Sequence, residues 1–259
     1  MRLLAVGDVC SECGCNYLQK KLPLLKREKN IDAVIINGEN SAIGNGVSKS
    51  SAQFLFALGA DVVTGGNHSL RNKEILPYLD ENEFLLRPHN LIDVENGSGY
   101  CFVDFGRYSM AVINLLGKIY LERVGAENPF LCVDELLERA KNDGAKIIVV
   151  DFHAEATSEK RAMGFYLDGK VSVVFGTHTH VQTADEQVLP NGTGYITDLG
   201  MTGPKNSVLG VKTDIIVNRL KDNDMSKFEF ADGEAMLCGC IFDIDEKNGK
   251  TTAVERICI

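Results

Sequence analysis

Five short segments of this 259-residue chain end in residues that commonly bind metal ions, and each follows an apolar run. Four of the runs are rich in Val and Ile (3–6, 33–36, 147–150 and 171–175), and the fifth, 61–64, is shorter. The segments are Gly7-Asp8, Gly38-Glu39-Asn40, Gly66-Asn67-His68, Asp151-Phe152-His153 and Gly176-Thr177-His178-Thr179-His180. In an open α/β sheet, ligands bind beyond the carboxyl ends of the strands. Five such ends could bring two carboxylates, three imidazoles and one or two amides to one crevice, enough for two divalent cations.

Strand-like and helix-like patterns alternate over the first 200 residues, which predicts βαβ units. Helices are expected at 17–29, 48–58, 73–79 and 133–142. Residues 100–105 and 109–115 predict a hairpin, and residues 234–244 and 251–259 predict a further pair of strands. No repeat or linker is visible, so the expected organisation is a single domain over residues 1–259.

Composition and charge limit the possible partners. No apolar run approaches the roughly 20 residues of a membrane span, and the N-terminus lacks the basic region and cleavage site of a signal peptide. We therefore expect a cytoplasmic protein with no membrane partner. The net charge of −9 argues against an extended nucleic-acid surface, which would normally be basic. A small phosphate ligand remains compatible, because bound cations can dominate the local field.

The eight cysteines suit a reducing compartment better than a disulfide scaffold at this chain length. Cys10, Cys13 and Cys15 lie close together after the first apolar run, so a metal or redox role is one interpretation of them. No second cluster has matching spacing, which favours free thiols in a loop.

Each candidate segment is weak evidence when taken alone, because Asp, Asn and single His residues often form turns or helix caps. The joint pattern is stronger, since four of the five histidines fall at these strand ends and only His89 does not. In an extended segment, His178 and His180 would point to the same side and reach neighbouring ions. Glycine directly before three of the candidates would let the backbone turn tightly near the ions.

This donor set suits two divalent or mixed-valence ions, with Fe and/or Mn fitting better than a thiolate-rich zinc site would. Two ions about 3.5–4 Å apart could hold a phosphate and a bridging hydroxide that attacks phosphorus in line. The expected chemistry is therefore hydrolysis of a phosphate ester.

At these residues the chain resembles the calcineurin-like metallophosphoesterase superfamily, and most closely its YmdB-like branch of bacterial cyclic-nucleotide phosphodiesterases. The resemblance covers most of residues 1–217. It is carried by four stretches, IINGEN at 35–40, DFHAEATSEK at 151–160, GTHTHVQTAD at 176–185 and ITDLGMTGP at 196–204. It implies an α/β fold, a two-sheet sandwich of metallophosphoesterase type with mixed strands and flanking helices.

The resemblance also implies a role for each candidate residue. Three residues would bind the first ion (Asp8, Asn40 and His180), three the second (Asn67, His153 and His178), and Glu39 would bridge both. His68 would act as proton donor and contact the phosphate. The implied substrate is a small phosphodiester, a 2′,3′- or 3′,5′-cyclic nucleotide, attacked by a metal-bridging hydroxide.

The chain departs from its branch beside the predicted pocket. Relatives usually show Gly-Asn-His-Thr-Trp-Asp where this chain has Gly66-Asn67-His68-Ser69-Leu70-Arg71, and Gly-Arg where it has Gly14-Cys15. These changes touch no proposed ligand, but they leave substrate preference open. The alternatives are a phosphomonoesterase or nucleotidase on the same centre, and a catalytically weak metal- or nucleotide-binding regulatory protein. The oligomeric state is also open, with a homo-oligomer as one option.

Overall fold

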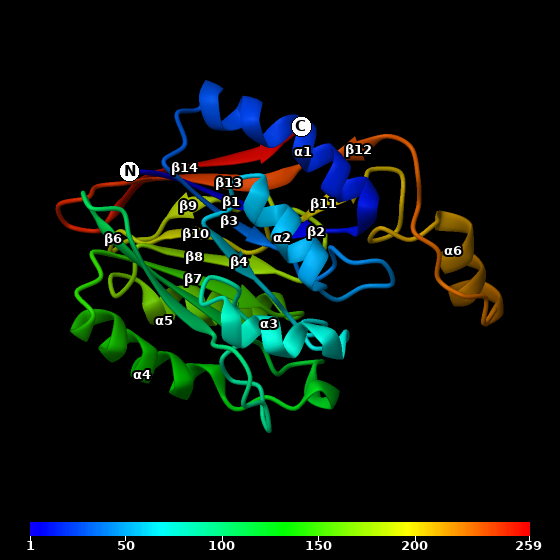
Figure 1. The fold of residues 1–259 in the computed structure, drawn as a ribbon, viewed down its shortest axis with the longest axis horizontal. Helices are drawn as coiled ribbons and strands as arrows, with labels where there is room; N and C mark the ends of the chain where they lie inside the picture. The colour runs from blue at the N-terminus through cyan, green and yellow to red at the C-terminus, as the bar shows by residue number, and fades with distance from the viewer.

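Two large β-sheets lie face to face in the computed structural model, which describes residues 1–259, and helices cover their outer sides (Figure 1). The first sheet has the order β14 (Thr251–Cys258), β13 (Cys238–Ile244), β1 (Arg2–Val6), β3 (Ala33–Asn37) and β4 (Val62–Thr64). The second has the order β5 (Tyr100–Asp104), β6 (Ser109–Leu116), β7 (Ile147–His153), β8 (Val173–Thr177), β10 (Gly194–Ile196) and β9 (Gln187–Val188). A small third sheet consists of β12 (Ala235–Met236), β11 (Met201–Pro204) and β2 (Asp8–Val9).

The helices divide between the two outer faces. The α-helices are α1 (Ser11–Glu28), α2 (Lys49–Ala57), α3 (Leu76–Glu81), α4 (Pro129–Asn142), α5 (Thr157–Leu167) and α6 (Thr213–Asp222). Two short 3-10 helices are η1 (Lys73–Ile75) and η2 (Glu122–Val124). In Figure 1, α1 and α2 lie on one side of the pair of sheets and α4 and α5 on the other, while α6 projects at one end.

Three apolar clusters fill the spaces between these layers. Leu3 of β1 and Val149 of β7 belong to the cluster between the sheets. Leu4 belongs to the cluster that joins the first sheet to α1 and α2, and Val150 to the one that joins the second sheet to α4 and α5. Adjacent residues of one strand therefore face two different cores, which explains why these strands are apolar throughout rather than alternating.

The expected α/β fold, with two packed sheets, mixed strands and flanking helices, is confirmed. β1 pairs parallel with β3 and antiparallel with β13, and β6, β7, β8 and β10 are parallel neighbours. The predicted hairpin is β5 with β6, and the predicted C-terminal pair is β13 with β14. No helix of the structure combines the length and apolarity that crossing a membrane requires.

The sequence reasoning missed several elements. Helix α1 begins at Ser11, six residues before the expected start, although its first turns carry Gly14 and cysteines, which are weak helix formers. Gly14 lies against the backbone of Thr202, so contact with β11 fixes this end of the helix. Helices α5 and α6 and the short strands β2, β9, β10, β11 and β12 were also not predicted individually.

Candidate metal centre

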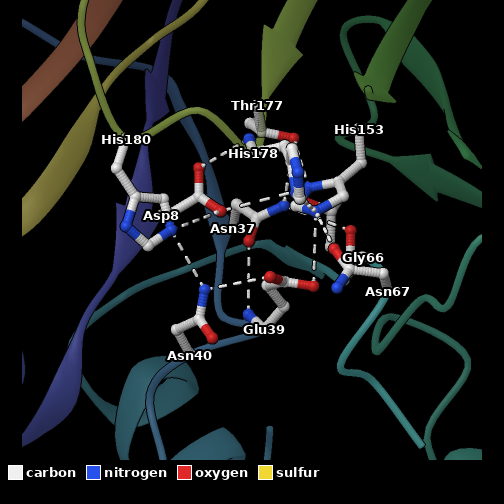
Figure 2. A network of polar contacts seen from close by, with 12 residues as sticks. Asp8, Asn37, Glu39, Asn40, Gly66, Asn67, His153, Thr177, His178 and His180 are labelled. Carbon is white, nitrogen blue, oxygen red and sulfur yellow. Dashed lines mark hydrogen bonds and ion pairs between the residues drawn. The ribbon is translucent and has the colours of Figure 1, made fainter. Parts of the chain in front are cut away.

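The candidate residues meet at the edge where strands of both sheets end, as Figure 2 shows. They come from five strand ends: Asp8 after β1, Glu39 and Asn40 after β3, Asn67 and His68 after β4, His153 at the end of β7, and His178 and His180 after β8. The structure thus brings all eight predicted site residues together. Their roles as ligands and proton donor are the subject of the proposal below.

His153 lies at one half of the site with its unprotonated nitrogen facing inward. Its Nδ1 is 2.9 Å from the Thr177 hydroxyl, which itself donates to Asp151 at 2.7 Å. The Thr177 oxygen therefore accepts the Nδ1 proton, and Nε2 keeps a lone pair. That lone pair faces Asn67 Oδ1 at 2.9 Å and Glu39 Oε2 at 3.4 Å.

His178 completes this half. Its Nε2 lies 3.0 Å from a carboxylate oxygen of Glu155, so Nε2 carries the proton and Nδ1 does not. The free Nδ1 lies 3.1 Å from His153 Nε2. Four potential ligand atoms, from Asn67, Glu39 and the two histidines, therefore face one another.

The other half of the site contains Asp8 and His180. Asp8 is fully buried, and its Oδ1 receives no hydrogen bond. His180 Nδ1 lies 3.1 Å from the carbonyl oxygen of Leu209, which accepts its proton and leaves a lone pair on Nε2. That Nε2 is 3.6 Å from Asp8 Oδ1, so two potential ligand atoms again face each other.

These residues fit a pair of bound cations. Oxygen and nitrogen lone pairs that face one another in a buried site repel one another unless a cation or a proton lies between them. Both halves consist of oxygen and imidazole donors, and in each the second histidine nitrogen is held by an outer partner, as in many metal sites. The ligand atoms of Glu39, His153 and His178 all lie within 4.8 Å of one another, which is compact enough for one ion.

Glu39 lies between the two halves (Figure 2). Its Oε2 accepts a hydrogen bond from the backbone N–H of His68 at 3.0 Å and faces His153, while Oε1 accepts from the Asn40 amide at 2.9 Å. This is the position that a bridging carboxylate needs.

Asn40 is turned the opposite way from a ligand. Its amide nitrogen, not its oxygen, faces His180 Nε2 at 3.2 Å, and its oxygen is 3.1 Å from His68 Nδ1. The two ends of an Asn side chain have the same shape and are assigned from their partners. Rotation of the amide by half a turn would present the oxygen to an ion.

His68 lies beside the centre rather than within it. Its Nδ1 is 3.2 Å from Glu39 Oε1, its Nε2 makes no hydrogen bond, and its side chain is 31% exposed. The turn that carries it starts at Gly66, where an added Cβ would overlap both Glu39 Oε2 and His153 Nε2. The glycine is needed for close approach and not for a left-handed backbone, since its φ is not positive.

The segment that carries His178 and His180 is not extended, contrary to the sequence-based expectation. The φ angles of the two residues are 104° and 63°, in the region that side chains other than glycine rarely adopt. Asp198 holds the segment by accepting from the backbone N–H of Thr179 at 3.1 Å and from its hydroxyl at 2.8 Å. Asp198 in turn forms a buried ion pair of 2.6 Å with Lys160 of α5.

The electrostatics of the site are dominated by the two buried carboxylates. Burial alone would raise the pKa of Asp8 and Glu39, but the neighbouring imidazoles hold the pKa of both below its ordinary value. Burial alone would lower the pKa of His153 and of His180, but Glu39 outweighs this effect at His153, and Cys10 and Asp8 outweigh it at His180. Both pKa values are raised, so a proton competes with a cation for the inward-facing nitrogen of each ring. Burial, assisted by His153, lowers the pKa of His178 to about 3, so its lone pair stays available to a cation at neutral pH.

Sequence reasoning missed the outer partners that fix the three histidines. Thr177, Glu155 and the Leu209 carbonyl each occupy the second ring nitrogen of one histidine. Glu155 and Thr177 lie in the two longest stretches that carry the family resemblance, 151–160 and 176–185. Their place in these stretches was the signal by which sequence reasoning could have found them. Nothing in the sequence pointed to Leu209, because it contributes only a backbone oxygen.

A cavity of about 240 Å³ opens over the centre. It is lined by six polar or charged members of the site, Glu39, Asn40, His68, Glu155, His178 and His180, and by apolar residues that include Phe230. Cys10 also lines it, with Sγ 3.6 Å from His180 Nδ1, and burial raises the pKa of this thiol. None of the eight cysteines forms a disulfide, and Cys13 and Cys15 lie in helix α1 rather than in the expected loop.

Comparisons with known proteins show which family the chain belongs to. A family model described as YmdB-like protein matches residues 4–257. The chain is 43% identical to the 2′,3′-cyclic-nucleotide 2′-phosphodiesterase of Bacillus subtilis, over all of this chain and 97% of that one.

Two solved structures are also similar over the whole chain. A crystal structure described as a novel phosphatase, from Mycoplasma pneumoniae, has a TM-score of 0.94 at 34% identity and is covered to 93% of its length. A hypothetical protein from Thermus thermophilus has a TM-score of 0.92 at 36% identity and is covered to 99%.

Proposed function

This chain belongs to the YmdB-like family of metallophosphoesterase fold, and on that premise we propose that it hydrolyses 2′,3′-cyclic nucleotides at a two-metal centre. The observation that supports the proposal is the convergence of imidazole nitrogens and carboxylate and amide oxygens on two adjacent points, with Glu39 between them. The preference for a 2′,3′- over a 3′,5′-cyclic substrate rests on the name of the Bacillus subtilis relative.

The proposed ligands form two sets around one shared carboxylate. Asp8, Asn40 and His180 hold the first ion, Asn67, His153 and His178 hold the second, and Glu39 contacts both. The mixture of oxygen and imidazole donors favours Fe and/or Mn. When bound, two such ions supply a nucleophile derived from water and neutralise the charge that develops on the phosphate.

His68 supplies the proton that the leaving group needs. Glu39 and Asn40 fix its Nδ1, so Nε2 is the nitrogen left to face a substrate in the cavity. Cleavage of the bond between phosphorus and the 2′-oxygen would leave an alkoxide, which takes the Nε2 proton and becomes the 2′-hydroxyl. The product is then a nucleoside 3′-phosphate.

The test combines metal analysis with a substrate panel. Purified protein loaded with Mn²⁺ or Fe²⁺ is assayed on 2′,3′- and 3′,5′-cyclic nucleotides and nucleoside monophosphates, and phosphorus NMR identifies the product. Two metal equivalents and a 3′-phosphate from the 2′,3′-cyclic substrate are the expected result.

Two other outcomes would replace this proposal. Hydrolysis of monophosphates alone would identify a phosphomonoesterase or nucleotidase on the same centre. Nucleotide binding by the fully loaded protein, without turnover of any substrate, would identify a regulatory protein.

A further inference from the structure

A second cavity of about 410 Å³ adjoins the metal centre, and no step described above uses it. Gly66, Asn67 and His68, which belong to the turn after β4, form the wall that it shares with the centre. His68 also lines the cavity over the centre, so it stands between the two spaces. A substrate whose phosphate lies at the centre could extend past His68 into this second cavity.

The rest of the lining is aliphatic apart from one charge. Five side chains are apolar, Leu70, Leu91, Ile92, Val94 and Val124, and the remaining residue is Arg71. Ligand sites of this size are commonly apolar with few polar groups that fix orientation. Aliphatic walls suit the flat face of a ring, and they offer no hydrogen bond to its edge.

The loop that forms one wall is rigid although it has no regular structure. The buried guanidinium of Arg87 donates to backbone carbonyls of five residues between 88 and 97, at 2.8–3.4 Å. The Asn90 amide ties the same loop to the carbonyls of Leu116 and Glu127. Leu91, Ile92 and Val94 are therefore held in place before any ligand arrives, which lowers the entropic cost of binding.

Arg71 is the polar group of this cavity, and its own side chain is unpartnered. The side chain is exposed, and its guanidinium makes neither an ion pair nor a hydrogen bond within the chain, although acidic residues outnumber basic ones by 36 to 27. A guanidinium carries five donors and no acceptor, so it pairs best with two acceptors side by side.

We propose that this cavity binds the base of the cyclic nucleotide and that Arg71 makes the site selective for guanine. The inference rests on the proposed function, because it assumes a nucleotide whose phosphate lies at the metal centre. Guanine presents N7 and O6 as adjacent acceptors, a pair that Arg binds in bidentate fashion. Adenine has an amino group in place of O6, so one Arg71 donor would meet another donor.

The experiment compares kcat/KM for 2′,3′-cyclic GMP, 2′,3′-cyclic AMP and the base-free diester methyl p-nitrophenyl phosphate. The wild-type protein should prefer the guanine nucleotide about 10- to 100-fold, the range that charge-assisted hydrogen bonds support. Arg71→Gln should remove this preference, mainly by raising KM for cyclic GMP, and should leave the base-free diester unchanged. Arg123→Gln is the matched control, because Arg123 is exposed on η2 and does not line the cavity.

A cavity-filling variant, Ile92→Trp, tests the cavity itself. It should raise KM for both nucleotides and leave the base-free diester unaffected. Equal kcat/KM for the two nucleotides in the wild-type protein, or a guanine preference that survives Arg71→Gln, would overturn the inference while the proposed function stands. Turnover of the base-free diester alone would instead remove the proposed function, and the inference with it.

Discussion

Each of the three histidines at the centre keeps one nitrogen free because a different group occupies the other. Thr177, Glu155 and the Leu209 carbonyl provide these contacts. The residues facing inward could be predicted from sequence, because each follows an apolar run and parallel strands end at one edge of a sheet. The outer partners could not, because they depend on which way each ring turns.

Glu39→Gln should lower metal content and turnover together. The amide keeps the shape but removes the charge that lies between the two groups of ligands, and one of its ends becomes a donor facing unprotonated nitrogen. Metal analysis of the purified variant, alongside its kcat, checks this. Two full equivalents with normal turnover would show that Glu39 is not the bridge.

His68→Ala should keep both ions and lose about 10²- to 10⁴-fold in kcat, the usual contribution of a general acid. The loss should be smaller on a diester that releases p-nitrophenolate, since this leaving group needs little protonation. The measurement is kcat of the variant on the cyclic nucleotide and on the p-nitrophenyl diester, with the metal content determined in parallel. Loss of one metal equivalent, or an equal effect on both substrates, would contradict the assignment.

At the scale of elements, most of the strands that could be predicted from the sequence are buried along their length. Strands such as β3 and β7 are buried along their whole length, and each begins with four consecutive apolar residues that the sequence shows clearly. Helix α6 has no buried residue, and strands β9 to β12 have only two to four residues each, so neither leaves a clear pattern. The strained segment after β8 was misjudged as extended because its backbone is set by a distant contact, the one with Asp198.

Lys160→Met should destabilise the protein strongly, because it leaves Asp198 buried without its partner. Breaking a buried pair in this way typically costs about 3–5 kcal/mol. Urea unfolding measures the loss, and metal content should fall as well, since Asp198 holds Thr179 between two proposed ligands, His178 and His180. Lys205→Met, which breaks the exposed pair with Glu234, is the control and should change neither quantity. An unchanged unfolding midpoint for Lys160→Met would show that the ion pair does not hold this segment.

At the scale of the whole molecule, the centre joins two sheets that meet elsewhere through apolar contacts and a few buried hydrogen bonds, such as those from Asn37 and Thr64 to Asp151. Removing the ions with a chelator would leave the buried carboxylates of Asp8 and Glu39 without the cations proposed to lie at that junction. A ligand present at 100 times its Kd stabilises a folded protein by about 2.7 kcal/mol. The melting temperature should therefore fall with EDTA and recover with added Mn²⁺ in a concentration-dependent way. A melting temperature independent of both additions would argue against bound ions.

The place of β1 within its sheet has a consequence for how the protein is made. β1 lies between β3, the next long strand in the chain, and β13, which is more than 230 residues away. Asp8 follows β1 directly, and the N–H of Gly7 beside it donates to Cys238 at the start of β13. On a ribosome the first proposed ligand is synthesised long before β13, so its strand lacks one neighbour until β13 has emerged. Metal loading is therefore expected to follow synthesis rather than accompany it, and a ribosome-bound chain halted before β13 should not retain the ions.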